Sequence, residues 1–112
     1  MEENQQNETP SLEASAFEII ALAGQAKSDT LVALKKVKVD EYEEARKLLK
    51  EANDLIVQAS SVHLKLLSRL SENSEENLPF LVIHAEDHYS QASYSYELVS
   101  ELLEIFEQKL SS

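Results

Sequence analysis

The chain has 112 residues, 10 basic against 21 acidic side chains and a net charge of −11, so its length suits one domain with a single core. The acidic charge argues against binding nucleic acid or an anionic membrane surface and favours a partner protein with a basic patch. The absence of cysteine excludes disulfides and thiolate chemistry. No apolar run reaches the roughly 18 residues of a membrane span, so we expect a cytoplasmic protein without direct membrane insertion.

Turn-forming residues are scarce. With one Gly and two Pro, the composition predicts an all-α fold rather than a many-stranded one. Residues 1–10 form a polar lead with little to bury, which we expect to be disordered. Residues 11–112 are assigned to one domain with helices over about 12–36, 41–70 and 79–110. Three long helices joined by short connectors predict an antiparallel up-down-up bundle.

The first helix has apolar or small residues at spacings of three and four, which predicts one buried face. That face comprises Phe17, Ile20, Gly24, Ser28, Leu31 and Leu34. Thr9 or Ser11 can cap the N-terminus. Gly24 costs helix stability, roughly 1 kcal/mol relative to Ala. It therefore either marks the close approach of a neighbouring helix or is tolerated without a packing role.

The second helix follows the connector "KVKVD". Asp40 and Glu43 match an Asp variant of the capping box, which predicts a helix start near Glu41. The apolar stripe of this helix comprises Ala45, Leu48, Leu49, Ala52, Leu55, Ile56, Ala59, Val62, Leu66, Leu67 and Leu70. His63 shares one side of the helix with apolar residues, so we interpret it as a packing residue rather than a ligand.

The third helix follows a polar loop at 71–77, and Pro79 suits its first turn. Its predicted stripe comprises Leu81, Ala85, His88, Ala92, Ser95, Val99, Leu102 and Phe106. Tyr94, Tyr96 and Leu98 add apolar area beside the stripe. One three-helix unit could not cover all of this surface, so the pattern favours self-association.

A polar cluster on the third helix carries the functional signal. His84, Asp87, His88 and Gln91 stand at i, i+3, i+4 and i+7 and therefore share one face beside the stripe. The pattern alone fits two interpretations equally well. The cluster is either a chemical site, or a satisfied core histidine among ordinary polar residues at the edge of the core.

Several kinds of histidine chemistry can be compared with this cluster. A zinc-protease helix needs Glu directly after the first His, and Ala85 occupies that position. A two-component phosphotransfer helix usually carries Lys and Gly beyond its His, where this chain has Asp87 and His88. A phosphohistidine carrier, in which a neutral imidazole accepts a phosphoryl group, is the third possibility. A helical scaffold without chemistry, or a metal-binding bundle that uses His84, Asp87 and His88, also stays open.

The run "VIHAEDHYSQA" resembles the active-site helix of the enzyme IIA components in the lactose and cellobiose or chitobiose branch of the bacterial sugar phosphotransferase system, where His-Ala-Gln-Asp-His is characteristic. The stretch "LAGQAKSDTLVALKKVKVDEYEEARKLLKEANDLIVQAS" is similar to the first two helices of that family. The likeness covers nearly all of residues 17–110. The chain departs from the pattern at Glu86, where Gln is usual, at Tyr89 and Ser90, where Leu-Met is frequent, and at Ser60, where His is expected.

The resemblance implies a cytoplasmic phosphotransferase component. It would accept a phosphoryl group from the histidine phosphocarrier protein and donate it to a IIB component for uptake of a disaccharide such as lactose, cellobiose or chitobiose. The family pattern implies phosphorylation of His84. His88 and Gln91 share its face and are the candidate supporting residues, which could orient either His84 or the incoming phosphoryl group. It also implies a homotrimer in which Asp87 binds a metal ion on the axis. We expect Mg²⁺, since a hard cation prefers oxygen ligands and retains waters.

Overall fold

The computed structural model describes residues 11–72 and 79–111. These residues form three α-helices and no strand: α2 (Leu12–Lys38), α3 (Tyr42–Glu72) and α4 (Phe80–Ser111). The prediction of an all-α fold is therefore confirmed, and the helix ends differ from the expected ones by one or two residues. The expected disordered lead at 1–10, with Thr9, lies outside the described residues, as does most of the loop at 71–77.

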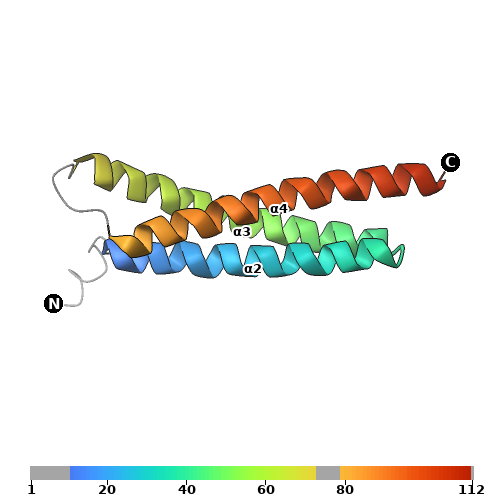
Figure 1. The fold of residues 1–112 in the computed structure, drawn as a ribbon, viewed down its shortest axis with the longest axis horizontal. Coiled ribbons are helices and arrows are strands. Elements are labelled where there is room, and N and C mark those ends of the chain that lie inside the picture. The colour runs from blue at the N-terminus through green and yellow to red at the C-terminus, as the bar shows by residue number, and fades with distance from the viewer. Residues whose placement is uncertain (1–10, 73–78, 112) are drawn as a thin grey trace.

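The three helices form an elongated body of 60 × 31 × 16 Å. Figure 1 shows the chain running along α2, returning along α3 and running forward again along α4, which crosses α3. Helix α2 packs extensively against both other helices, whereas α3 and α4 share a smaller contact. None of the described helices has an apolar stretch long enough to cross a bilayer.

The buried face of α2 consists mainly of alanines. Its fully buried apolar residues are Ala16, Ile19, Ala23, Ala26 and Ala33. The predicted face was therefore wrong in part: the side chains of Phe17 and Leu31 are 61% and 58% exposed, whereas Ile20 and Leu34 are half-buried against the core. Since small side chains let neighbouring helices approach closely, packing selected the alanine face of α2. Counting large apolar residues, by contrast, favours the adjacent face.

Gly24 does not mark a close contact between helices. A Cβ atom placed there would meet no other atom within 4 Å. Of the two interpretations of Gly24, the structure agrees with a glycine that is tolerated without a packing role, because α2 packs its alanine face, and not the Gly24 side, against α3 and α4.

The predicted stripes of the other two helices agree better with the structure. The buried residues of α3 are Ala45, Leu49, Ala52, Ile56, Ala59 and Leu66, all members of the predicted stripe. Leu67, also expected in this stripe, is 43% exposed. In α4, the buried residues are Val82, Ala85, Ala92, Val99 and Leu103. Phe106, expected in the stripe, is 45% exposed, because the buried face near the end of α4 passes through Leu103 instead.

Asp40 ends α2 rather than capping α3. Its φ of 62° lies in the left-handed region. Its N–H donates to the Val37 carbonyl at 3.1 Å, and the Glu41 N–H donates to the Lys36 carbonyl at 2.9 Å. This pair of bonds is a Schellman motif. The predicted capping box was wrong, because the short connector uses Asp40 to close α2, and the first helical acceptor of α3 is the Glu41 carbonyl, bonded by the Ala45 N–H.

The N-terminus of α2 follows the prediction. The Ser11 hydroxyl accepts a hydrogen bond from the Ala14 N–H at 3.0 Å, which satisfies one of the amides that a helix start leaves without a partner. At the start of α4, Pro79 stands directly before the first helical residue, and its carbonyl accepts the Val82 N–H at 3.0 Å.

Candidate functional site

The polar cluster of α4 lies between its buried face and an exposed apolar strip. This apolar strip comprises Ile83, Tyr94, Leu98 and Ile105, whose exposed fractions run from 46% to 68%. At the helical turn of about 100° per residue, these residues and Asp87 fall within an arc of about 60°. His84, His88 and Gln91 follow next around the helix, before the buried Ala85 and Ala92.

His84 and His88 face each other across one turn of α4. Their Nε2 atoms are 3.1 Å apart, and the rings meet edge to face, with centroids 4.5 Å apart and an interplanar angle of 88°. His84 is exposed, whereas His88 is half-buried. The His84 ring also lies near Phe80, with ring centroids 6.1 Å apart. Because the His84 side chain is exposed, solvent or a partner protein can approach it.

Lys27 of α2 completes the cluster. Its Nζ lies 3.3 Å from His88 Nδ1 and 3.0 Å from Gln91 Oε1, to which it donates. The sequence interpretation missed this residue because 61 and 64 positions separate Lys27 from its two partners. In the sequence, Lys27 stands between Ala23 and Thr30, which both proved to be buried. A lysine at the edge of the buried face of α2 was the one feature that could have indicated it.

The charge state of His88 follows from this setting. Burial lowers the pKa of His88 below its usual value of 6.5, and the neighbouring Lys27 ammonium and His84 lower it further, while Asp87 acts in the opposite direction. A lowered pKa keeps the ring neutral near pH 7. The neutral His88 ring therefore has one N–H that can donate and one lone pair that can accept a hydrogen bond, for its two neighbours Lys27 and His84.

Asp87 stands apart from these contacts. Its carboxylate is exposed and, within residues 11–72 and 79–111, no hydrogen bond or ion pair is made to it. Within the same ranges, no three His, Cys, Asp or Glu side chains are placed to hold a metal ion, including the trio His84, Asp87 and His88. In one chain, Asp87 presents an exposed carboxylate on the apolar strip.

A second polar group lies on another side of α4. The His63 Nε2 atom of α3 is 2.5 Å from Glu86 Oε1, and the His63 ring stacks on Tyr89 with centroids 4.8 Å apart. The His63 side chain is only 15% exposed. This agrees with its interpretation as a packing residue. Two departures from the family pattern, Glu86 and Tyr89, therefore contact the same histidine, and Ser60 precedes that histidine by one turn.

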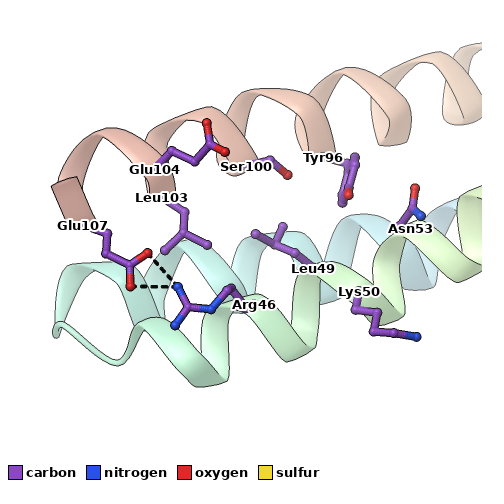
Figure 2. Close-up of a pocket in the computed structure, with 9 residues that line it drawn as sticks. All are labelled: Arg46, Leu49, Lys50, Asn53, Tyr96, Ser100, Leu103, Glu104 and Glu107. Carbon is purple, nitrogen blue, oxygen red and sulfur yellow. Dashed lines mark hydrogen bonds and ion pairs between the residues drawn. The ribbon is translucent and has the colours of Figure 1, made fainter.

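A groove between α3 and α4 lies away from both histidine groups. Figure 2 shows it with Arg46 and Glu107 joined at one end, where Arg46 Nη1 donates to both carboxylate oxygens at 2.6 and 2.8 Å. The groove has a volume of ≈ 430 Å³ and also includes Leu49, Lys50, Asn53, Tyr96, Ser100, Leu103 and Glu104. Ser100 is about 24 Å along α4 from His84, at 1.5 Å per residue, so the groove is not part of the histidine cluster.

Comparison with known proteins agrees with this arrangement. The family described as "PTS system, Lactose/Cellobiose specific IIA subunit" matches residues 14–107. The chain is 32% identical over 92 residues to the PTS system lactose-specific EIIA component of Streptococcus mutans, covering 82% of this chain and 88% of that protein. It is 27% identical over 103 residues to the PTS system N,N'-diacetylchitobiose-specific EIIA component of Escherichia coli, covering 92% and 89%.

Solved structures show the same fold. The PTS cellobiose-specific enzyme IIA of Bacillus anthracis superposes with a TM-score of 0.83 at 23% identity, over 96% of this chain and 98% of that one. The IIA chain in the solution structures of the IIA(Chitobiose)-HPr complex of Escherichia coli gives 0.79 at 26% identity, over 93% and 100%. With the family match covering most of its length, the chain belongs to the lactose/cellobiose-specific IIA family of the phosphotransferase system and is a phosphotransferase component that carries phosphohistidine.

Proposed function

We propose that His84 carries the phosphoryl group in this IIA component and that the protein acts in the cytoplasm. The component accepts the phosphoryl group from the histidine phosphocarrier protein and passes it to a IIB component during disaccharide uptake. One observation supports His84 above all. It is the exposed histidine of the cluster, and its Nε2 atom lies 3.1 Å from the Nε2 atom of a second ring.

The transfer step needs an unprotonated ring nitrogen on the acceptor. The lone pair of His84 Nε2 forms a bond to phosphorus, while the bond from phosphorus to the donor's ring nitrogen breaks and its electron pair returns to that nitrogen. The donor ring, protonated on its other nitrogen, leaves as a neutral imidazole, and the phosphorylated His84 ring keeps its Nδ1–H and takes over the positive charge, so the step requires no external proton. Since the protein does little bond-making chemistry in such a transfer, positioning and electrostatics supply most of the rate.

His88 and Gln91 support this step from one turn further along α4. The His88 Nε2 atom, adjacent to the reacting nitrogen, can hydrogen-bond a phosphoryl oxygen after transfer. Gln91 acts through Lys27, since the same ammonium contacts both Gln91 and His88. The net charge of −11 opposes the arrival of a phosphoryl dianion, so we expect a basic surface of the donor protein to complete the site.

Labelling with the phosphorylated donor tests the assignment. The wild-type protein and His88→Gln should both gain acid-labile, base-stable phosphate, whereas His84→Gln should gain none. Full labelling of His84→Gln with loss in His88→Gln would move the carrier role to His88. A wild-type protein that takes up no phosphate would favour a helical scaffold without chemistry.

We also propose that the antiparallel three-helix units assemble as a homotrimer through the apolar strip of α4. Four large apolar side chains of this strip are about half-exposed or more in one chain, and burying them would remove apolar area from water. Sedimentation at micromolar concentration should give three times the chain mass of 12.6 kDa. A species of 12.6 kDa alone would reject the trimer.

Asp87 lies within this strip and would come near its own copies on a three-fold axis. At about 4 Å and an effective dielectric near 20, each pair of carboxylates costs on the order of 4 kcal/mol. A shared cation or a proton is therefore required, and Mg²⁺ suits oxygen ligands. Asp87→Leu should keep or raise trimer stability, since it replaces an enclosed charge with apolar volume. A folded but monomeric Asp87→Leu would show instead that the carboxylate holds the assembly together.

A further inference from the structure

We infer that Lys27 is a positioning residue: it holds His88 in the tautomer that carries its proton on Nε2, and so keeps the lone pair of His84 Nε2 available to accept the phosphoryl group. The inference rests on the proposed function, because it assigns Lys27 a part in the phosphorylation of His84. It adds a residue from another helix to a site otherwise built from α4.

The direction of the first hydrogen bond follows from the chemistry of an ammonium group, which can only donate. Lys27 Nζ lies 3.3 Å from His88 Nδ1, so Nδ1 must offer a lone pair. A neutral imidazole with an unprotonated Nδ1 carries its hydrogen on Nε2. The opposite tautomer would point an N–H at the ammonium, which places two donors against each other.

The direction of the second hydrogen bond follows from the first. With its hydrogen on Nε2, His88 donates across the 3.1 Å contact to His84 Nε2. The acceptor nitrogen of His84 must then be unprotonated, and the neutral His84 ring carries its hydrogen on Nδ1. The two hydrogen bonds, from Lys27 to His88 and from His88 to His84, thus leave Nε2 of the exposed His84 ring unprotonated and able to attack phosphorus.

The position of Lys27 is itself constrained. The residue is half-buried, and its ammonium also donates to Gln91 Oε1 at 3.0 Å, so two acceptors on α4 orient one donor from α2. These two contacts fix the position of the ammonium beside His88 Nδ1.

The transfer step uses this arrangement directly. When phosphorus takes the lone pair of His84 Nε2, the His88 N–H loses its acceptor and can donate to a phosphoryl oxygen instead. Without Lys27, the His88 ring can place its hydrogen on Nδ1 and present a lone pair to His84. His84 would then hold its own hydrogen on Nε2, where it blocks the attack.

Ring-nitrogen NMR of ¹⁵N-histidine-labelled protein, without any donor, measures the tautomers directly. The spectra are recorded above the usual histidine pKa of about 6.5. We expect His88 with its hydrogen on Nε2 in the wild type and in Lys27→Arg, whose guanidinium also only donates. Lys27→Met should shift His88 toward the other tautomer and slow phosphoryl transfer to His84 by about tenfold or more, within the range of misplaced catalytic groups. Lys35→Met, which removes an exposed lysine of the same helix, should change neither.

Two results would overturn the inference: a wild-type His88 with its hydrogen on Nδ1, or a Lys27→Met protein with unchanged tautomers and an unchanged transfer rate. The wild-type spectrum decides the first of these even if Lys27→Met fails to fold. Failure of the proposed function is distinguishable, because it appears as absence of phosphate on His84 in the wild type, whatever the tautomer of His88.

Discussion

Two histidines with polar partners lie on different sides of α4, and they differ in exposure and in the group that each one contacts. On one side, His63 is largely enclosed, its Nε2 atom faces the Glu86 carboxylate, and its ring is covered by Tyr89. On the other side, His84 is exposed, and its Nε2 atom faces the ring of His88. A carrier needs a reachable lone pair, so partner and exposure, rather than residue type, distinguish the two.

The strongest test of this comparison exchanges one histidine on each side for glutamine. His88→Gln should slow transfer to His84 by up to roughly 100-fold, because the residue that orients the reacting nitrogen is lost, while the phosphate still ends on His84. His63→Gln should change the rate by no more than about twofold. Stopped-flow or quenched-flow labelling measures both rates, and a large loss in His63→Gln would show that the enclosed side takes part in transfer.

A second test removes the carboxylate of the enclosed side. Glu86→Ala should lower the free energy of unfolding by about 1 kcal/mol, because it leaves the half-buried His63 nitrogen without its partner. Transfer to His84 should stay unchanged. Urea denaturation measures the loss, and Glu51→Ala is the matched control, since Glu51 is exposed in the middle of α3. Equal effects of both variants would contradict a structural role for the His63–Glu86 contact.

A third variant changes stability without touching either side. Gly24→Ala should raise the free energy of unfolding by about 0.5–1 kcal/mol, since Ala favours helix more than Gly and a Cβ at this position meets no atom within 4 Å. The rate of phosphoryl transfer to His84 should stay unchanged. Thermal unfolding checks the direction, and a loss of stability would mean that another subunit covers this part of α2.

The smallest expected effect concerns pH. The folded pKa of His88 is lowered, mainly by burial, so at acidic pH the unfolded chain binds this proton more readily than the folded one. The contribution of His88 to stability is complete above its unfolded pKa of about 6.5 and declines as the pH falls toward the folded value. Urea midpoints between about pH 7.5 and 5.5 should therefore fall more in the wild type than in His88→Gln. An equal decline in both would contradict the lowered pKa.

The sequence alone was sufficient for the all-helical fold, the buried stripe of α3 and the polar face of α4 with its family resemblance. These features depend on spacings of three and four within one helix, which a sequence displays directly. The assignment of His84 as the carrier, of His88 and Gln91 as its supports and of Asp87 as a metal ligand remains a prediction that the experiments above address.

Only the tertiary structure decided which face of α2 is buried and which residues from other helices reach α4. Close packing selected the alanine face of α2 over the face with Phe17 and Leu31, and that rotation carried Lys27 to His88 and Gln91. The contact between His63 and Glu86 likewise joins residues 23 positions apart on different helices. Helical periodicity describes neighbours on one helix, whereas such contacts depend on how each helix is rotated about its axis when the core closes.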